Sequence, residues 1–164
     1  MHRLVLASGI LRRAGAVLLV RCRYEGEPQP LWTLPGGRQD LGETLCAAVR
    51  REFREEASLE VDVGELAYVS ESIDPARQLQ VVNCTFWVRE RQPALQPRSH
   101  DSKVVEARFV PASEAPALLR ADVLRIPVAA ALGGGAYPRH FSFEPQDIVV
   151  PFFSGQRRRR ADEV

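Results

Sequence analysis

The sequence has little of what marks a secreted, zinc-stabilised or membrane-spanning protein. It contains three cysteines in 164 residues, and none of them forms a Cys-x-x-Cys pair. An odd count without that spacing indicates neither a disulfide framework nor a zinc site. A reducing cytoplasm is therefore the expected compartment. No apolar run approaches membrane-spanning length. The short apolar stretch near the N-terminus ends at Arg12 and Arg13 without a clear cleavage pattern, so no signal peptide is expected.

The chain also lacks an excess of either charge. It has 22 Lys and Arg against 21 Asp and Glu, for a formal net charge of +1. The four arginines at 157–160 belong to a charged tail, residues 156–164, which we expect to be disordered and solubilising. The rest is about neutral, so neither nucleic acid nor a membrane surface is expected as a partner.

The length suggests one domain, and the hydrophobic pattern predicts alternating strands and helices. Strands are predicted at residues 4–11, 16–23, 31–34, 59–72, 78–89 and 104–110. Helices are predicted at residues 43–57, 113–119 and 122–132, the last interrupted by Pro127. Strands interleaved with helices indicate an α/β sandwich with one central mixed sheet.

Three glycines at 133–135 predict a flexible break, which gives a domain over residues 1–132 and an extension over 133–155. The extension contains an apolar segment at 148–153, which we expect to dock on the domain or to form an interface. The second option is compatible with a homodimer.

The helix predicted at 43–57 carries three carboxylates at helical spacing. Glu52, Glu55 and Glu56 stand at i, i+3 and i+4, away from the apolar stripe of Leu45, Val49 and Phe53. Carboxylates so close repel one another unless cations neutralise them. Mg²⁺ prefers such oxygen ligands together with substrate phosphates. Alone, however, an acidic helix face is more often a solvated surface paired with nearby arginines.

The residues upstream make the motif more specific. Gly37, Glu43, Arg51, Glu52, Glu55 and Glu56 resemble the Nudix box, Gly-x5-Glu-x7-Arg-Glu-U-x-Glu-Glu-x-Gly-U, where U is bulky and apolar. Six fixed letters match by chance on the order of 10⁻⁷ times per starting position. The box covers residues 37–59, and the surrounding layout extends the resemblance over about residues 4–132.

This resemblance implies a Nudix-type α/β/α sandwich with a loop-helix-loop catalytic motif. It implies that Glu52, Glu55 and Glu56 bind Mg²⁺ or Mn²⁺, that the carbonyl of Gly36 adds a ligand, and that Glu43 pairs with Arg51 to brace the helix. Gly37 would support the box. The implied reaction is hydrolysis of a nucleoside diphosphate linked to another group, so the implied partner is a nucleotide-type small molecule.

The catalytic base and the substrate stay open. Glu56 is one candidate for the base, and Glu106 and Glu71 are alternatives from later in the chain. Pro75 stands at about the spacing found in ADP-sugar pyrophosphatases, although a single proline there is more often a turn. Trp32 is the best candidate for stacking on a base, and Arg21, Arg23 and Arg77 for contacting phosphates, with core packing and solvation as the simpler roles.

One residue departs from the box. Ser58 stands where the family has its second glycine, which ends the helix with φ > 0. Serine in that conformation costs about 1 kcal/mol. We therefore expect a shifted turn with metal binding retained. Ser58 is also the one feature that favours an alternative, a catalytically weak nucleotide-binding or regulatory module.

Overall fold

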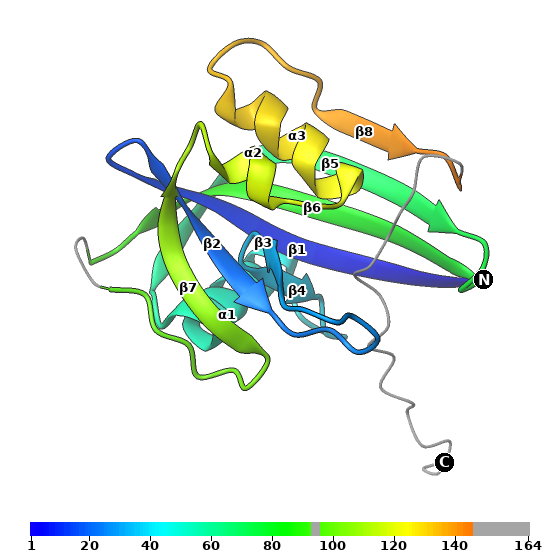
Figure 1. Ribbon diagram of the computed structural model, residues 1–164, viewed down its shortest axis with the longest axis horizontal. Helices are drawn as coiled ribbons and strands as arrows, with labels where there is room; N and C mark the ends of the chain where they lie inside the picture. The colour runs from blue at the N-terminus through cyan, green and yellow to red at the C-terminus, as the bar shows by residue number, and fades with distance from the viewer. Residues whose placement is uncertain (93–95, 146–164) are drawn as a thin grey trace.

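The structure, a computed structural model, describes residues 1–92 and 96–145. Eleven elements follow one another in this part of the chain (Figure 1). They are β1 (His2–Arg13), β2 (Ala16–Cys22), β3 (Leu31–Thr33), β4 (Gly36–Arg38), α1 (Leu45–Ala57), β5 (Val61–Asp74), β6 (Leu79–Glu90), β7 (Val104–Pro111), α2 (Ala115–Leu118), α3 (Asp122–Leu132) and β8 (His140–Phe143).

The strands form two sheet portions that share β1. In the mixed sheet, β1 pairs with β4 and, in parallel, with β6, and the order continues through β5 to β8. In the antiparallel sheet, β2 pairs with β3 and β7. A tight turn at Ala14 and Gly15, both with positive φ, joins β1 to β2. These two strands pair at Arg12–Val17 and Arg13–Ala16, close to the turn, and the two sheets face each other beyond it.

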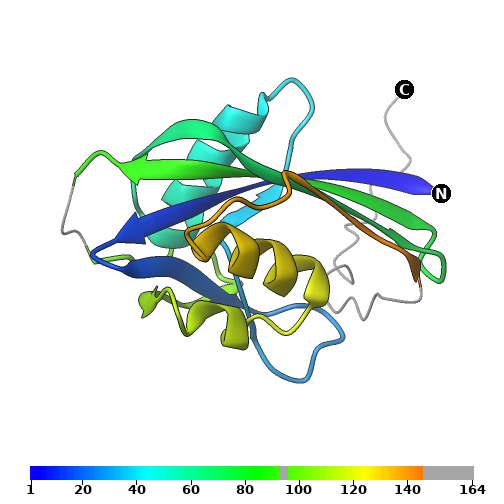
Figure 2. The same cartoon turned by 90° about the horizontal axis from the view of Figure 1, so that it is seen from above.

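Helices cover both sides of the mixed sheet, with α1 on one side and α3 on the other (Figure 2). The α1-side core includes Ala7, Leu11, Val49 and Phe53, whereas the α3-side core includes Ile10, Leu19, Tyr68 and Val128. Alternate residues of β1 therefore face opposite cores. This arrangement is the α/β sandwich with a mixed sheet that the sequence predicted.

Helix α1 follows its predicted stripe, but it begins later than predicted. Thr44 is the N-cap residue, and its side chain accepts a hydrogen bond from the N–H of Ala47. Glu43 thus precedes the helix instead of starting it. Val49 and Phe53 are fully buried, and Gly9 makes room for the Phe53 ring, because a Cβ at Gly9 would lie 2.7 Å from it.

The expected shift of the turn at Ser58 was wrong. Ser58 adopts the left-handed conformation, φ 54° and ψ 35°. Its N–H donates to the carbonyl of Arg54, and the N–H of Leu59 donates to that of Phe53. Because Ala57 and Leu59 are both buried, the packing on either side holds the residue in a conformation that serine does not favour.

The expected interruption of the third helix was also wrong, since α3 runs from Asp122 to Leu132 with Pro127 inside it. Pro127 is buried. After α3 the glycines turn the chain back, and β8 adds a parallel strand to β5. The apolar segment at 148–153 and the tail at 156–164 lie outside the described residues.

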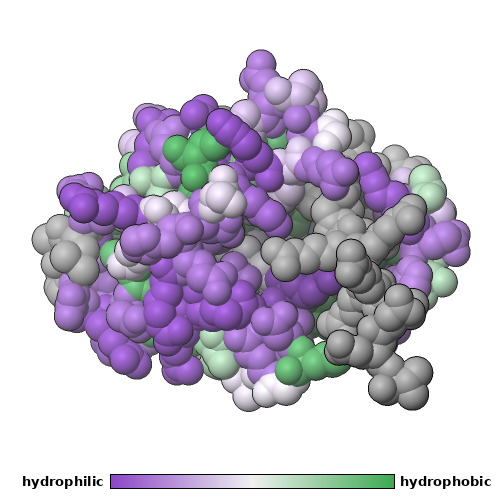
Figure 3. All heavy atoms as spheres, turned by 90° about the horizontal axis from the view of Figure 1, so that it is seen from below, coloured by the Kyte–Doolittle hydropathy of each residue, from purple (hydrophilic) through white to green (hydrophobic). Residues whose placement is uncertain are grey.

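In the described residues, no helix has the length and apolar character needed to span a membrane. Hydrophilic side chains cover most of the described surface on the face in Figure 3, with the hydrophobic ones scattered. This face therefore shows no broad apolar patch of the kind that marks an interface.

Candidate active site

The site begins where α1 meets the glycine turn. The carboxylates of Glu52 and Glu56 point towards this turn, and the two residues are 8% and 6% exposed. Oε2 of Glu56 accepts a hydrogen bond of 2.9 Å from the N–H of Gly36. A Cβ at Gly37 would lie 2.3 Å from Oε1 of Glu52. A side chain at position 37 would therefore displace the carboxylate of Glu52 from its place at the turn.

Glu55 stands apart from this pair. Its side chain is 49% exposed, and it contacts Arg51 at 3.4 Å. Among residues 1–92 and 96–145, no three acidic, histidine or cysteine side chains are grouped as a ready metal site. The structure thus brings Glu52 and Glu56 together and leaves Glu55 at the rim.

Arg51 braces the site as the resemblance implied. Its guanidinium donates two hydrogen bonds of 3.0 Å to the carboxylate of Glu43, one of 2.9 Å to the carbonyl of Arg38 and one of 2.7 Å to Glu52. A bidentate arginine–carboxylate pair fixes geometry as well as charge. Arg51 therefore ties the loop before α1 to β4 and to Glu52.

The electrostatics of the pair favour a bound cation. Burial, followed by the charge of Glu52, raises the pKa of Glu56. Burial also raises the pKa of Glu52, against the opposing effect of Arg51. In contrast, the hydrogen bonds from Arg51 lower the pKa of Glu43. One arginine does not balance these carboxylates, and their oxygens are the donors that Mg²⁺ and Mn²⁺ prefer. The residues present thus fit a divalent hard cation.

A further carboxylate, Asp101, was missed by the sequence analysis. Its charge raises the pKa of both Glu52 and Glu56. The loop before β7 docks on the end of α1. The N–H groups of His100 and Asp101 both donate to the carbonyl of Glu55, and the N–H of Arg98 donates to the carbonyl of Ala57. The only sequence signal was an acidic residue before a strand, which many surface loops share.

Cys22 and Tyr24 also lie beside the carboxylates, and nothing in their spacing indicated it. Burial, followed by the charge of Glu56, raises the pKa of Cys22. Burial, followed by the effect of Cys22, raises the pKa of Tyr24, and Glu56 adds to it. The charges of Glu52 and Glu56 thus favour the neutral forms of Cys22 and Tyr24.

The later glutamates proposed as the base lie elsewhere. Glu106 is within β7, opposite Arg21, and contacts Arg21 and Arg108 at 3.3 Å each. Glu71 contacts His140 at 3.0 Å. Neither is among the main causes of the raised pKa values of Glu52 and Glu56. The ion-pair partners of Glu106 lie on β2 and β7, and that of Glu71 lies on β8.

The residues considered for substrate contact are spread over the molecule. The guanidinium groups of Arg108 and Arg21 lie 4.9 and 5.5 Å from the centre of the Trp32 ring. Arg23 lies beside Lys103, to whose carbonyl its N–H donates. Pro75 and Arg77 are in the turn between β5 and β6, where the N–H of Arg77 donates to Asp74. Pro75 therefore has the simpler role of a turn residue.

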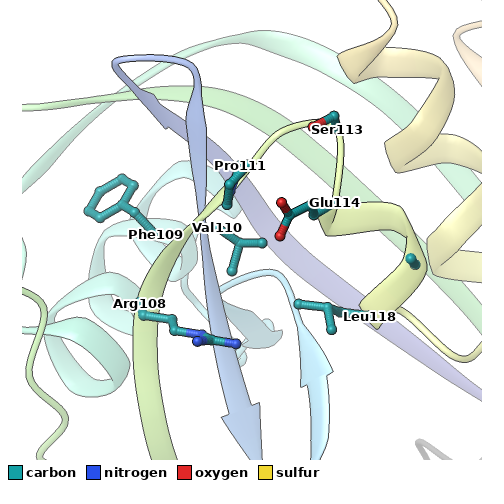
Figure 4. Close-up of a pocket in the computed structure, with 8 residues that line it drawn as sticks. Arg108, Phe109, Val110, Pro111, Ser113, Glu114 and Leu118 are labelled. Carbon is teal, nitrogen blue, oxygen red and sulfur yellow. The ribbon is translucent and has the colours of Figure 1, made fainter.

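A pocket of about 460 Å³ lies between β7 and α2. In Figure 4, Arg108, Val110, Glu114 and Leu118 surround it, whereas Phe109 points the other way. None of the helix carboxylates lines this pocket, so it is separate from the site at Gly36.

Comparisons with known proteins agree with this geometry. A family model described as the NUDIX domain matches residues 1–132. The human protein "8-oxo-dGDP phosphatase NUDT18" is 31% identical over 146 residues, which cover 88% of this chain and 43% of the relative. The "CTP pyrophosphohydrolase" of Escherichia coli K12 is 32% identical over 65 residues, 40% of this chain and 48% of that protein. This chain thus spans less than half the length of these curated relatives.

Among solved structures, a NUDIX hydrolase from Nitrosomonas europaea has a TM-score of 0.70 at 21% identity, covering 88% of this chain and 80% of that one. At this identity the likeness supports the fold alone.

Proposed function

The chain belongs to the Nudix hydrolase family, and we propose that it uses Mg²⁺ or Mn²⁺ to cleave the diphosphate bond of a nucleoside diphosphate or one of its derivatives. The observation that carries this proposal is the buried Glu52–Glu56 pair at the Gly36 turn, whose negative charge Arg51 only partly offsets. A bound divalent cation would neutralise this charge and polarise the phosphoryl oxygens of the substrate.

In the proposed reaction, water attacks one phosphorus and the bridging P–O bond breaks. The products are a nucleoside monophosphate and the phosphorylated partner, or inorganic phosphate from a simple diphosphate. Glu52 and Glu56 hold the cation, Glu55 completes its ligands from the rim, and Arg51 keeps Glu52 in position. The proton of the attacking water passes to a carboxylate, for which Glu56 and Asp101 are the candidates that the geometry favours.

The names of the relatives and the sequence motif together define a substrate panel. It contains 8-oxo-dGDP, CTP, ADP-ribose and a dinucleoside polyphosphate, each assayed for product with Mg²⁺, with Mn²⁺ and with EDTA. We expect turnover of at least one member, with either metal and not with EDTA. No turnover of any member would contradict the proposal.

Glu56→Gln tests the carboxylate pair. The amide retains an oxygen that can accept from the N–H of Gly36 but loses the charge, so we expect kcat to fall about 10²- to 10⁴-fold. Glu60→Gln is the matched control, because Glu60 pairs with Arg54 on the exposed side of the same helix end. Equal activity of the Glu56 and Glu60 variants would exclude the assigned role of Glu56.

The two later carboxylates are compared in the same assay. We expect Asp101→Asn to lower kcat more than Glu106→Gln, because the charge of Asp101 raises the pKa of both helix carboxylates, whereas Glu106 pairs with Arg21 and Arg108. A larger loss in the Glu106 variant would transfer the role of base to Glu106.

The alternative of a weak binding module loses its support at Ser58. The residue keeps the left-handed conformation that the family glycine would have, and the carboxylates on the preceding turn stay in place. Binding of a nucleotide by calorimetry, with no product from any panel member, would restore this alternative.

A further inference from the structure

A cluster of small polar side chains is buried in the middle of the mixed sheet. Ser8 on β1 and Asn83 and Thr85 on β6 are 6%, 7% and 0% exposed. Oγ of Ser8 lies 3.0 Å from Oδ1 of Asn83 and 2.9 Å from Oγ1 of Thr85. Ser8 alternates with Ala7, which packs towards α1, so the cluster faces the side of α3 and of the antiparallel sheet.

The direction of these hydrogen bonds leaves one group available. Oδ1 of Asn83 can only accept, so the hydroxyl of Ser8 donates to it and accepts in turn from Thr85. The chain of bonds thus fixes the carboxamide of Asn83 through its oxygen. Among the described residues, the hydrogen bond of the Asn83 side chain is the one that Oδ1 accepts from Ser8, and Nδ2 is not one of the fully buried atoms without a partner. Asn83 therefore presents two N–H donors, with one lone pair of Oδ1 beside them.

This cluster adjoins the carboxylate pair through Gly36. Ser8 is the register partner of Gly36 on β4, and a Cβ at Gly36 would lie 2.5 Å from the Cβ of Ser8. The N–H of the same glycine donates to Glu56. Only the backbone of one residue therefore separates Ser8 from Glu56. Asn83, on the next strand, is roughly two strand spacings, about 10 Å, from the carboxylates.

From this arrangement we propose that Asn83 determines substrate specificity by reading the edge of the nucleobase, while the diphosphate lies at Glu52 and Glu56. A carboxamide with adjacent donors and acceptor matches a base edge that carries the complementary pair. Ser8 and Thr85 act as positioning residues that hold the carboxamide. This inference rests on the proposed function, since it names the part of the site that selects among nucleotides.

A purely structural role for the cluster has a different signature. Side chains on neighbouring strands often form hydrogen bonds with one another, and in a structural role such a bond contributes only to the stability of the fold. Loss of such a bond would lower the unfolding temperature and weaken all ligands together. Mutation of a residue that hydrogen-bonds the base should instead change the relative affinities for different bases. A buried polar group of the site discriminates against a base that offers it no hydrogen-bond partner.

The test measures binding of products, so it does not depend on turnover. The full chain is titrated by calorimetry in EDTA with AMP, GMP, CMP, UMP and 8-oxo-dGMP. The variants are Asn83→Leu, which removes the polar group, and Asn83→Ser, which retains an acceptor for Ser8 in case the leucine variant does not fold. Gln80→Leu is the control, because Gln80 is on the same strand and accepts from Arg3 at an exposed position.

We expect the parent protein to prefer one or two of the monophosphates. Both Asn83 variants should bind the preferred one about ten- to a hundredfold more weakly, with the other affinities nearly unchanged, and the Gln80 variant should keep the preference. A preference that survives in both Asn83 variants, or a parent that binds all five alike, would overturn the inference. If no member of the substrate panel is hydrolysed, the proposed function is overturned instead. The binding of the monophosphates can still be measured and interpreted in that case.

Discussion

Ser58 shows how a single residue can hold a strained conformation without moving the site. Its φ of 54° is one that serine rarely adopts. Its Oγ is buried and has no hydrogen-bond partner in the part of the chain that the structure describes. The strain is tolerated because the hydrogen bonds and the buried neighbours fix the end of α1.

Ser58→Gly should therefore stabilise the protein. We expect the free energy of unfolding to rise by about 1 kcal/mol, because glycine adopts this conformation without a Cβ penalty. Removal of the unpaired hydroxyl adds to this. Chemical denaturation measures the change. Ser58→Ala removes the hydroxyl alone, and Ala14→Gly relieves the same kind of strain (φ 47°) in the β1–β2 turn. A loss of stability in Ser58→Gly would refute the explanation.

At the scale of elements, α1 combines a core-facing stripe with a carboxylate pair that destabilises the metal-free protein. Phe53 and Val49 anchor the helix, while Glu52 and Glu56 are buried with raised pKa values. The packing of the stripe holds two charges where they repel each other. The same repulsion favours a bound cation. The carboxylate pair therefore lowers the stability of the metal-free protein and raises its affinity for a metal.

The raised pKa values of Glu52 and Glu56 predict that the free energy of unfolding depends on pH. Between the usual carboxyl pKa of 4.5 and the raised folded values, the native state binds more protons than the unfolded state. The free energy of unfolding should therefore fall as the pH rises through this range. Without metal, the Glu52→Gln/Glu56→Gln double variant should lack this fall and be more stable than the parent at pH 8. Thermal unfolding in EDTA measures both.

Added Mg²⁺ should raise the unfolding temperature of the parent at pH 8 and leave the double variant nearly unchanged. Glu43→Gln provides a contrast of opposite sign. The pKa of Glu43 is lowered, so its stabilising contribution is present above pH 4.5 and is lost as the pH falls through the folded value. Parallel pH profiles for the parent and the double variant would contradict the prediction.

At the scale of the whole molecule, the chain beyond α3 completes the mixed sheet. Strand β8 pairs with β5 from Val69 to Ser72, directly after the irregular part of β5, where the register shifts around Leu66. The guanidinium of Arg139 donates to the carbonyls of Leu66 and Ala67 and to the hydroxyl of Tyr137. The Arg139 side chain thus supplies hydrogen-bond donors to backbone carbonyls at the point where the register of β5 shifts.

Arg139→Ala should lower the free energy of unfolding by about 1–3 kcal/mol, because hydrogen bonds from a charged donor are among the stronger ones. Arg125→Ala is the control, since Arg125 forms an exposed ion pair with Asp122 on α3 and such pairs contribute about 0–1 kcal/mol. Denaturation curves of the two variants check this. Similar losses in both would mean that Arg139 is an ordinary surface residue.

The sequence predicted those features that depend on local pattern. The strand alternation, the apolar stripe of α1, the pairing of Glu43 with Arg51 and the family were all predicted correctly. It did not reveal Asp101, because a loop docks on a helix only through tertiary contacts. It offered Glu106 as one alternative for the base, and it could not show that Glu106 would lie opposite Arg21 across β2 and β7. The short β8 carries no distinctive pattern, because it forms by pairing with an existing edge.

The position of β1 in the sheet also bears on how the chain folds. This first strand pairs in parallel with β6 over ten register pairs, from His2–Leu79 to Leu11–Val88. During synthesis, residues 2–13 must therefore wait for about eighty later residues to emerge before their main partner exists. The entropy cost of closing a loop of that length arises before the strand pairing can stabilise the chain. We expect slow folding and a nascent N-terminal hairpin with an open edge, a state in which chaperones would have the most to protect.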